Sequence, residues 1–207
     1  MYKKPIIVFE GVECSGKTFH INSVSKYLKK KGLKFIKIRE PGGSLNSEKI
    51  RKLILNKEIK FNKFTDLLLY LAARNENINN ILLKNYKKKI ILIDRFSDST
   101  IAYQSYGMGL NLKIIKYINK LILKNFKVDY TILNTVNRKN LKLRLNKRKS
   151  LNRYDQFDYN FYNKVQKGFL KLAKGNKKYL IIDSNRSIKL NKEKILNKVL
   201  ELVKKNI

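Results

Sequence analysis

The order of apolar and polar residues along the chain predicts strands that alternate with helices. The apolar runs are continuous rather than interrupted at every second position, which is typical of strands buried on both faces of a parallel sheet. Five such runs lie at 5–10, 33–40, 89–95, 129–134 and 179–184. Segments with the period of amphipathic helices lie at 18–31, 45–56, 64–86, 111–125, 138–150, 156–174 and 189–205.

This alternation predicts an α/β fold: a doubly wound five-stranded parallel sheet flanked by helices and joined by right-handed crossovers. The 207 residues contain no internal repeat and no linker, so we expect one domain spanning 1–207. The stretch 138–155 is basic and poor in large apolar residues. We expect it to form a mobile lid.

Composition narrows the class of protein. Hydrophobic residues make up 43% of the chain, which is typical of a globular domain. Cys14 is the only cysteine, so no disulfide can form within the chain. No apolar run is long enough for a signal peptide or a membrane span. We therefore expect a soluble, cytoplasmic protein with no membrane partner.

The formal net charge of +33, taken alone, indicates a nucleic-acid partner. The excess is mostly lysine, spread evenly and accompanied by many asparagines and isoleucines, and these three residue types share A/T-rich codons. The sequence has no dense block of arginines with interleaved aromatic residues. We interpret the charge as compositional drift and expect no specific nucleic-acid partner.

The first apolar run leads into a phosphate-binding motif, GVECSGKT. Gly11 and Gly16 allow backbone angles that point successive N–H groups at a phosphate, and the following helix adds its positive N-terminal end. Lys17 is predicted to reach the β- and γ-phosphates of ATP, and Thr18 to ligate Mg²⁺. The predicted ATP-binding residues in this loop are Gly11, Val12, Glu13, Cys14, Ser15, Gly16, Lys17 and Thr18.

Two side chains of this loop need separate explanations. Glu13 costs electrostatic energy in a loop that holds anions, so it either faces a cation or a hydroxyl group, or is solvated on the outer lip. Cys14 precedes a helix N-terminus, where a thiol pKa is expected to be lowered. Alkylation of Cys14 is expected to block ATP. His20, the only histidine, is expected to be an ordinary first-turn helix residue.

Two segments after the second predicted strand indicate a second ligand. REPGGS places Arg39 at a strand end, ahead of the turn at Pro41, where it is either an anion ligand or a surface arginine. LLLYLAAR puts Tyr70 and Arg74 on one helical face. They either grip a base and a phosphate, or belong to an amphipathic helix with a core tyrosine, which the spacing alone favours.

A third motif, DRFSDSTIAYQ, begins at the end of the third predicted strand. Asp94 occupies the position where phosphate-loop enzymes keep an acidic residue near Mg²⁺, bound directly or through water. Arg95 follows at once. Thr100, Tyr103 and Gln104 fall on the next helical turns, and the Gln104 amide can both donate to and accept from a base edge.

Together these motifs resemble the thymidylate kinase family of nucleoside monophosphate kinases. FEGVECSGKT, REPGGS, LLLYLAAR, DRFSDSTIAYQ and NRYDQFDYNFYNKVQKGFLKLA occur in the family's order and spacing, over most of the chain. The resemblance implies a P-loop NTPase fold and the reaction ATP + dTMP → ADP + dTDP, with Mg²⁺ and no general base. It also implies a homodimer formed through helices packed face to face.

The resemblance assigns roles around the phosphate and the sugar of dTMP. It implies that Arg39, Arg74 and Arg95 surround the phosphate. It implies that Tyr103 lies against the deoxyribose, where it helps to exclude a ribose 2′-hydroxyl. Glu13 is implied to meet the sugar 3′-hydroxyl or magnesium-bound water.

The resemblance assigns further residues to the base. Tyr70 is implied to stack on thymine in place of the family's usual phenylalanine, and its hydroxyl then needs a partner or water. Thr100 and Gln104 are implied to contact the base. The implied dTMP-binding residues are Glu13, Arg39, Pro41, Tyr70, Arg74, Arg95, Thr100, Tyr103 and Gln104.

The lid carries Arg144, Arg148 and Arg153. In one family branch a basic residue follows the loop acid, and in the other a lid arginine stabilises the transferring phosphoryl group. Cys14 carries no positive charge, so the chain resembles the second branch. The match at NRYD favours Arg153, with Arg148 second and also an expected ATP ligand, whereas Arg144 is expected to be a surface charge. The implied catalytic residues are Lys17, Arg95, Arg153 and Glu13.

Three alternative functions stay open at this point. A kinase for another nucleotide or nucleoside would differ in its acceptor. A nucleic-acid-binding P-loop protein would hydrolyse ATP in response to DNA or RNA. A catalytically inactive nucleotide-binding module would lack a group that the chemistry needs, and the sequence contains all of them.

Overall fold

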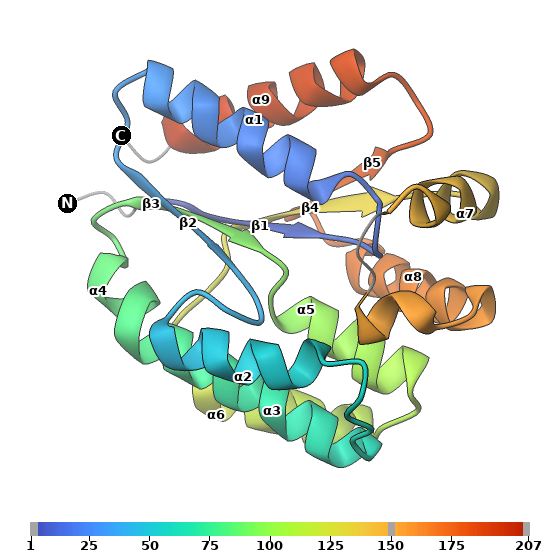
Figure 1. The fold of residues 1–207 in the computed structure, drawn as a ribbon. Helices are drawn as coiled ribbons and strands as arrows, with labels where there is room; N and C mark the ends of the chain where they lie inside the picture. The colour runs from blue at the N-terminus through green and yellow to red at the C-terminus, as the bar shows by residue number, and fades with distance from the viewer. Residues whose placement is uncertain (1–3, 149–151, 205–207) are drawn as a thin grey trace.

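The structure of the protein is a computed structural model that describes residues 4–148 and 152–204. One parallel five-stranded sheet runs through the molecule, with the strand order β2-β3-β1-β4-β5 (Figure 1). The predicted α/β class and parallel sheet are confirmed. The strands are β1 Ile6–Glu10, β2 Phe35–Arg39, β3 Ile90–Asp94, β4 Tyr130–Thr135 and β5 Tyr179–Asp183.

Helices cover both faces of this sheet. In Figure 1, α1 and α9 lie on one side, and α2, α3, α6 and α8 lie on the other. The α-helices are α1 Lys17–Lys30, α2 Leu45–Leu55, α3 Lys63–Asn77, α4 Leu83–Asn85, α5 Ser97–Thr100, α6 Leu112–Leu123, α7 Arg138–Asn146, α8 Tyr159–Ala173 and α9 Ile188–Lys204. A π-helical turn at Ile78–Leu82 joins α3 to α4, so the predicted helix 64–86 is a continuous helical segment.

The central strand explains why its apolar residues are continuous in the sequence. Ile7 and Phe9 pack against α1 and α9, and the alternate residues Ile6 and Val8 pack on the opposite face. All four are at most 1% exposed. Burial on both faces holds the carboxyl end of β1, and therefore the loop after it, in one place.

Two predicted helices differ at their boundaries. The helix predicted at 138–150 ends at Asn146, and positions 149–150 lie outside the described residues, as does part of the predicted lid. The helix predicted at 156–174 begins at Tyr159, because the Asp158 side chain accepts a hydrogen bond from the backbone N–H of Phe161 and starts the helix there.

One helical segment was missing from the predicted helices. α5 continues into a π-helical stretch, Ile101–Gly107, directly after β3. Four successive residues of it, Ile101 to Gln104, are buried. The third motif places Thr100, Tyr103 and Gln104 on helical turns here, but successive buried residues have no amphipathic period, so the pattern gives no bounds for this helix.

Candidate active site

The phosphate loop between β1 and α1 has the backbone that its glycines predicted. Gly11 and Gly16 have φ angles of 135° and 91°, which residues with a Cβ rarely adopt. A Cβ at Gly11 would also lie 2.2 Å from the carbonyl oxygen of Asn134 in β4. Position 11 therefore requires glycine for two independent reasons.

Lys17, the first residue of α1, folds back over this loop. Its Nζ donates hydrogen bonds to the carbonyl oxygens of Gly11, at 2.9 Å, and Val12, at 2.7 Å. The side chain is buried, and burial lowers the pKa of its ammonium group to about 8. A positive charge is thus held inside the loop, next to backbone N–H groups suited to an anion.

Thr18 and Asp94 both line the cleft beside the loop. Asp94 ends β3 and pairs in register with Phe9 of β1, so its carboxylate lies at the same sheet edge as the phosphate loop. In the described parts of the chain, three or more histidine, cysteine or acidic residues nowhere gather as a metal cluster. A hydroxyl and one carboxylate fit Mg²⁺, which keeps several waters and takes its other oxygens from phosphates.

Arg95 connects the end of β3 to the phosphate loop. Its Nη1 donates to the Gly11 carbonyl at 2.8 Å, and its Nη2 donates to the Glu13 carboxylate at 2.9 Å. Glu13 also accepts a short hydrogen bond from the Tyr103 hydroxyl. The solvated alternative for Glu13 is excluded, because its side chain is only 11% exposed and pairs with two residues.

Buried Glu10 holds the turn that carries Arg95. Arg95 has a φ of 65°, a left-handed conformation that is uncommon for a side chain of this size. Glu10 accepts hydrogen bonds from the backbone N–H groups of Phe96, at 2.8 Å, and Ser99, at 3.2 Å. Burial, with repulsion from Asp98, raises the pKa of Glu10 to about 8. Sequence reasoning did not single out Glu10, because the residue reads as the end of an apolar strand.

A small inner pocket lies beyond Arg95. It collects predicted residues from α3 and from the segment after β3, which are far apart in the sequence. Buried Tyr154, which the sequence analysis did not assign, forms part of its wall. The lining residues are Glu13, Glu40, Tyr70, Arg74, Arg95, Phe96, Ser99, Thr100, Tyr103, Gln104 and Tyr154.

Arg74 is held rigidly in this pocket. Its Nε donates to Glu40 at 2.8 Å, and its Nη1 donates to Thr100 at 2.9 Å and to Asn119 at 2.8 Å. Arg74 and Glu40 are 2% and 4% exposed. Burial raises the pKa of Glu40, and the Arg74 guanidinium opposes that rise. The amphipathic-helix alternative holds only in part. Tyr70 packs against a core cluster, but Arg74 is buried rather than on the surface, and both residues line the pocket.

An outer cavity of about 360 Å³ continues from the inner pocket to the phosphate loop. The two share five lining residues: Glu13, Glu40, Tyr70, Arg95 and Tyr154. Its volume is in the range of sites for ligands of nucleotide size. The remaining lining residues include Cys14, Lys17, Thr18, Pro41, Arg51, Asp94, Arg148 and Asn152.

Arg39 does not line this continuous cleft. Its side chain is 57% exposed, beside the open edge of β2, and pairs with Glu48 at 3.2 Å. Arg51 of α2 lines the cleft instead and donates to the Pro41 carbonyl oxygen at 2.5 Å. Sequence reasoning missed Arg51, because nothing in the sequence distinguishes it from the many basic residues around it.

The lid arginines have three different environments. Arg148 lines the cleft and pairs with Asp155. The Arg153 guanidinium pairs with buried Asp66 of α3 and is not part of the cleft lining. Its assignment as the catalytic lid arginine stays a prediction, and Arg148 is the lid arginine that lines the cleft together with Lys17.

Arg144 is not a surface charge, contrary to the prediction. It donates to the Cys14 carbonyl at 3.0 Å and to the Ser184 carbonyl at 2.7 Å. One guanidinium therefore connects the phosphate loop to the loop after β5. The contact could not be predicted, because both acceptors are backbone atoms that are distant in the sequence.

Two further predictions on the loop and α1 need correction. Burial raises the pKa of the Cys14 thiol, because the half-buried site disfavours the thiolate more than nearby cations favour it. His20 lies in the first turn of α1, as predicted, but it is 2% exposed, and within the described residues its Nδ1 has no hydrogen-bond partner. Burial lowers the pKa of His20 to about 4.

A phosphate loop that shares one cleft with a pocket of arginines and aromatic residues defines a P-loop kinase that acts on a small phosphorylated acceptor. The family model for thymidylate kinase matches residues 9–195. Thymidylate kinases of Prochlorococcus marinus and Thermosipho africanus are 40% and 37% identical over 90% and 88% of this chain, and 91% and 90% of their own lengths. The chain belongs to the thymidylate kinase family, which phosphorylates dTMP to dTDP with ATP.

A solved structure supports the same assignment. The crystal structure of thymidylate kinase from Ehrlichia chaffeensis superposes with a TM-score of 0.76 at 30% identity, covering 96% of this chain and 98% of the other. The fold is therefore the P-loop NTPase fold that the sequence predicted.

Proposed function

We propose that this chain catalyses the reaction of its family, ATP + dTMP → ADP + dTDP, with Mg²⁺. One observation supports this most directly: the phosphate loop and the inner pocket open into one cleft, and the Arg95–Glu13 pair lies between them. A donor triphosphate and an acceptor monophosphate bound in that cleft would meet at Arg95.

The loop and Lys17 would bind the β- and γ-phosphates of ATP. Thr18 and Asp94 would hold Mg²⁺, which would supply positive charge to the phosphates of ATP. Arg148 is the lid arginine that lines this part of the cleft, so we assign to it the stabilisation of the transferring phosphoryl group that the sequence had favoured for Arg153.

The inner pocket would hold dTMP. Tyr70 would stack on the thymine base, and Thr100 and Gln104 would contact its polar edge. Arg74 lines the inner pocket and not the outer cavity, so we place it beside the base rather than at the phosphate, where the resemblance had put it. Tyr103 would lie against the deoxyribose.

The dTMP phosphate would meet Arg95 and Arg51, since Arg51 lines the cleft where Arg39 does not. An oxygen of the dTMP phosphate would then attack the γ-phosphorus of ATP in line, and ADP would leave. This chemistry needs positioning and positive charge rather than a general base.

The test is ADP release with ATP, Mg²⁺ and each of dTMP, dUMP, dCMP, dGMP, AMP, UMP and thymidine. A strong response to dTMP, weaker with dUMP and lost in Lys17→Ala, is the expected result. The proposal is overturned if no monophosphate elicits ADP release and ATP turnover appears only when DNA or RNA is added.

Helices α3 and α6 pack against each other within the chain. The expected homodimer would use the exposed apolar residues of these two helices. Leu68 of α3 and Tyr117 and Leu121 of α6 are 46%, 65% and 56% exposed. Tyr117 and Leu121 lie four residues apart and share one helical face. Sedimentation should give a dimer for the wild type and a monomer for Tyr117→Lys/Leu121→Lys. A wild-type monomer at micromolar concentration would exclude this interface.

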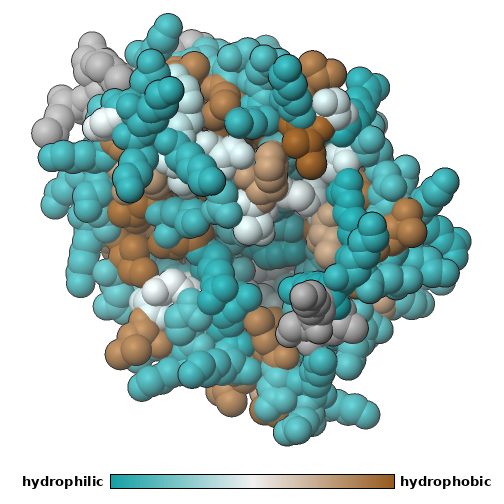
Figure 2. All heavy atoms as spheres, turned by 45° about the horizontal axis from the view of Figure 1, so that its top comes forward, coloured by the Kyte–Doolittle hydropathy of each residue, from teal (hydrophilic) through white to brown (hydrophobic). Residues whose placement is uncertain are grey.

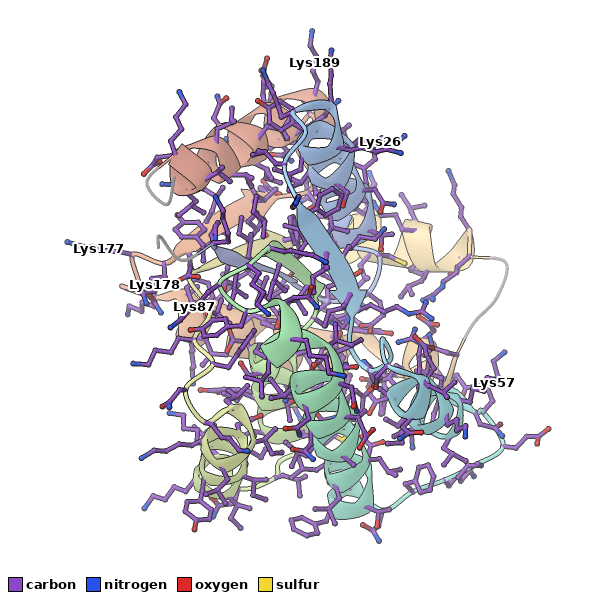
Figure 3. The ribbon with its side chains drawn as sticks, turned by 90° about the vertical axis from the view of Figure 1, so that its left-hand side faces the viewer. Lys26, Lys57, Lys87, Lys177, Lys178 and Lys189 are labelled. Atoms are coloured by element: carbon purple, nitrogen blue, oxygen red, sulfur yellow. The ribbon has the colours of Figure 1, made fainter. Side chains whose placement is uncertain are left out.

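The large positive charge requires no nucleic-acid partner in this proposal. Figure 2 shows a face that is largely hydrophilic. In Figure 3, Lys26, Lys57 and Lys189 extend from different parts of the molecule toward solvent, whereas Lys87, Lys177 and Lys178 extend on the same side of the view. Among the described residues, no helix is both long and apolar enough to cross a membrane. A cytoplasmic location stays a prediction.

A further inference from the structure

We propose that Asp66 and Tyr154 are positioning residues that fix the orientation of the Gln104 amide, and thereby make the inner pocket selective for a base with an N–H at ring position 3. The inference rests on the proposed binding of the base in that pocket. It adds two residues that act through Gln104; of these, Tyr154 also forms part of the pocket wall, whereas Asp66 lies outside the lining.

The three side chains form one buried hydrogen-bonded cluster. Gln104 Nε2 donates to Asp66 Oδ2 at 3.1 Å and to the Tyr154 hydroxyl at 3.3 Å. The Tyr154 hydroxyl in turn donates a short hydrogen bond to the same Asp66 oxygen. Each of the three residues is at most 3% exposed. Water therefore has little access to compete for these bonds.

The positions of the hydrogens in this cluster follow from chemistry. Asp66 pairs with the Arg153 guanidinium through its other oxygen, Oδ1, and an ion-paired carboxylate can only accept hydrogen bonds. The single proton of the Tyr154 hydroxyl is donated to Asp66, so toward Gln104 this hydroxyl can only accept. Both neighbours of the Gln104 amide nitrogen are thus acceptors, and both of its hydrogens are committed.

The opposite orientation of the amide is strongly disfavoured. It would bring the Gln104 carbonyl oxygen against the Asp66 carboxylate and leave buried acceptors facing each other. With the nitrogen engaged at Asp66 and Tyr154, the carbonyl oxygen is the group that Gln104 has left for a ligand. Gln104 therefore offers an acceptor to the pocket.

This acceptor lies in a pocket that also contains the donor-only guanidinium of Arg74. Thymine and uracil carry an acceptor at O4 and a donor at N3, which match a donor and an acceptor on the wall. Cytosine presents the inverse pattern, a donor at N4 and an acceptor at N3. A fixed Gln104 amide consequently rejects cytosine by leaving buried polar groups unpaired.

The substitution Asp66→Asn tests this directly. Arg153 still requires an acceptor at the Oδ1 position, so the new NH₂ group takes the place of Oδ2 and faces Gln104. The Gln104 amide is then expected to turn and present its N–H to the pocket. We expect kcat/KM for dTMP relative to dCMP to fall about tenfold or more. The ratio of their dissociation constants, measured by calorimetry without ATP, should fall in parallel.

Tyr154→Phe provides a second variant in case Asp66→Asn does not fold. It removes one acceptor from Gln104 Nε2 and leaves Asp66 in place, so a smaller fall of the dTMP-to-dCMP ratio, by about threefold, is expected. Tyr162→Phe is the matched control, since Tyr162 donates to the Tyr154 backbone carbonyl at 2.7 Å and has no hydrogen bond to Gln104. In Tyr162→Phe, kcat/KM for dTMP relative to dCMP should stay unchanged.

The outcomes separate this inference from the function on which it rests. Gln104→Ala should lower kcat/KM for dTMP, and an unchanged value would contradict the proposed contact with the base. If Gln104→Ala lowers that value but neither Asp66→Asn nor Tyr154→Phe shifts the ratio, the positioning role is overturned. Asp66→Glu keeps a carboxylate at this position, unlike Asp66→Asn. It should therefore keep the selectivity for dTMP over dCMP even where its activity is low. If Asp66 had only a structural role, its substitution would lower kcat/KM for dTMP and for dCMP by the same factor.

Discussion

The guanidinium of Arg95 and the carboxylate of Glu13 form an ion pair of 2.9 Å across the cleft, between the end of β3 and the middle of the phosphate loop. The same guanidinium donates to the Gly11 carbonyl at 2.8 Å. One arginine therefore supports the loop and faces the inner pocket. This arrangement explains why a phosphate loop contains a glutamate: its charge is matched by Arg95, and the loop can still hold an anion.

Removal of that carboxylate is expected to impair use of the acceptor more than binding of ATP. In Glu13→Gln the charge that orients Arg95 is lost, and hydrogen bonds to charged groups contribute about 1.5–3 kcal/mol. We expect kcat/KM for dTMP to fall about 10- to 100-fold, with a smaller change in KM for ATP. Steady-state kinetics with each substrate varied in turn measures both.

The control for this prediction is Glu48→Gln. It makes the same chemical change in the exposed Arg39–Glu48 pair, which lies outside the cleft lining. Exposed pairs contribute little, so activity should change less than about twofold. Equal losses in the two variants would show that the Glu13 effect is not specific to the site.

Arg148 and Arg153 should differ in what their loss changes. Arg148 lines the cleft, so Arg148→Ala should lower kcat about a thousandfold or more, as for other arginines that stabilise phosphoryl transfer. Arg153→Ala removes the partner of Asp66, whose side chain is 2% exposed. Leaving a buried carboxylate unpaired should lower the free energy of unfolding by about 3 kcal/mol.

Urea unfolding and single-turnover kinetics on the same two variants separate these effects. A thousandfold loss of kcat in Arg153→Ala, with stability unchanged, would return the catalytic role to Arg153. This result would also show that the Arg153–Asp66 ion pair does not stabilise the fold.

His20 should make stability depend on pH. Its pKa is about 4 in the folded protein and near 6.5 when unfolded, so between these values the unfolded state binds more protons. Stability should therefore be full above pH 6.5 and fall by ~3 kcal/mol as the pH drops to about 4. Urea titrations of the wild type and His20→Leu test this. Parallel pH curves for the two proteins would contradict it.

Cys14 should react slowly with thiol reagents. Burial raises the pKa of this thiol, so its thiolate fraction at neutral pH is below that of free cysteine. Because Cys14 is the only cysteine, one label per chain reports on it alone. The rate of alkylation should rise only at pH values above those at which a free cysteine thiol reacts, and ATP should slow it.

Complete modification of Cys14 should abolish ATP binding, since the side chain lines the cleft at the phosphate loop. Full activity after complete labelling would show that the thiol points away from bound ATP. Rapid labelling at neutral pH would show that the site is more open to water than its burial indicates.

Much of the fold was predictable from local pattern. The buried strands carry continuous apolar runs, and Gly11 to Thr18 form a motif whose backbone demands are met only by those residue types. The helix after β3 had no predicted bounds, because four successive buried residues in it have no amphipathic period. Asp66 was also missed, although its spacing of four residues from Tyr70 and eight from Arg74 places all three on one helical face.

The sequence by itself determined the parallel sheet, the phosphate loop and the family, because each depends on residues close together in the chain or on motifs in a fixed order. Only the tertiary structure decided which arginines face the cleft. Arg51, Arg144 and Arg148 differ from other basic residues in their hydrogen-bond partners, which lie 10, 130 and 7 positions away in the sequence, respectively. The residue type alone does not indicate such partners. In a chain with 48 lysines and arginines, position in three dimensions rather than residue type distinguishes the functional cations.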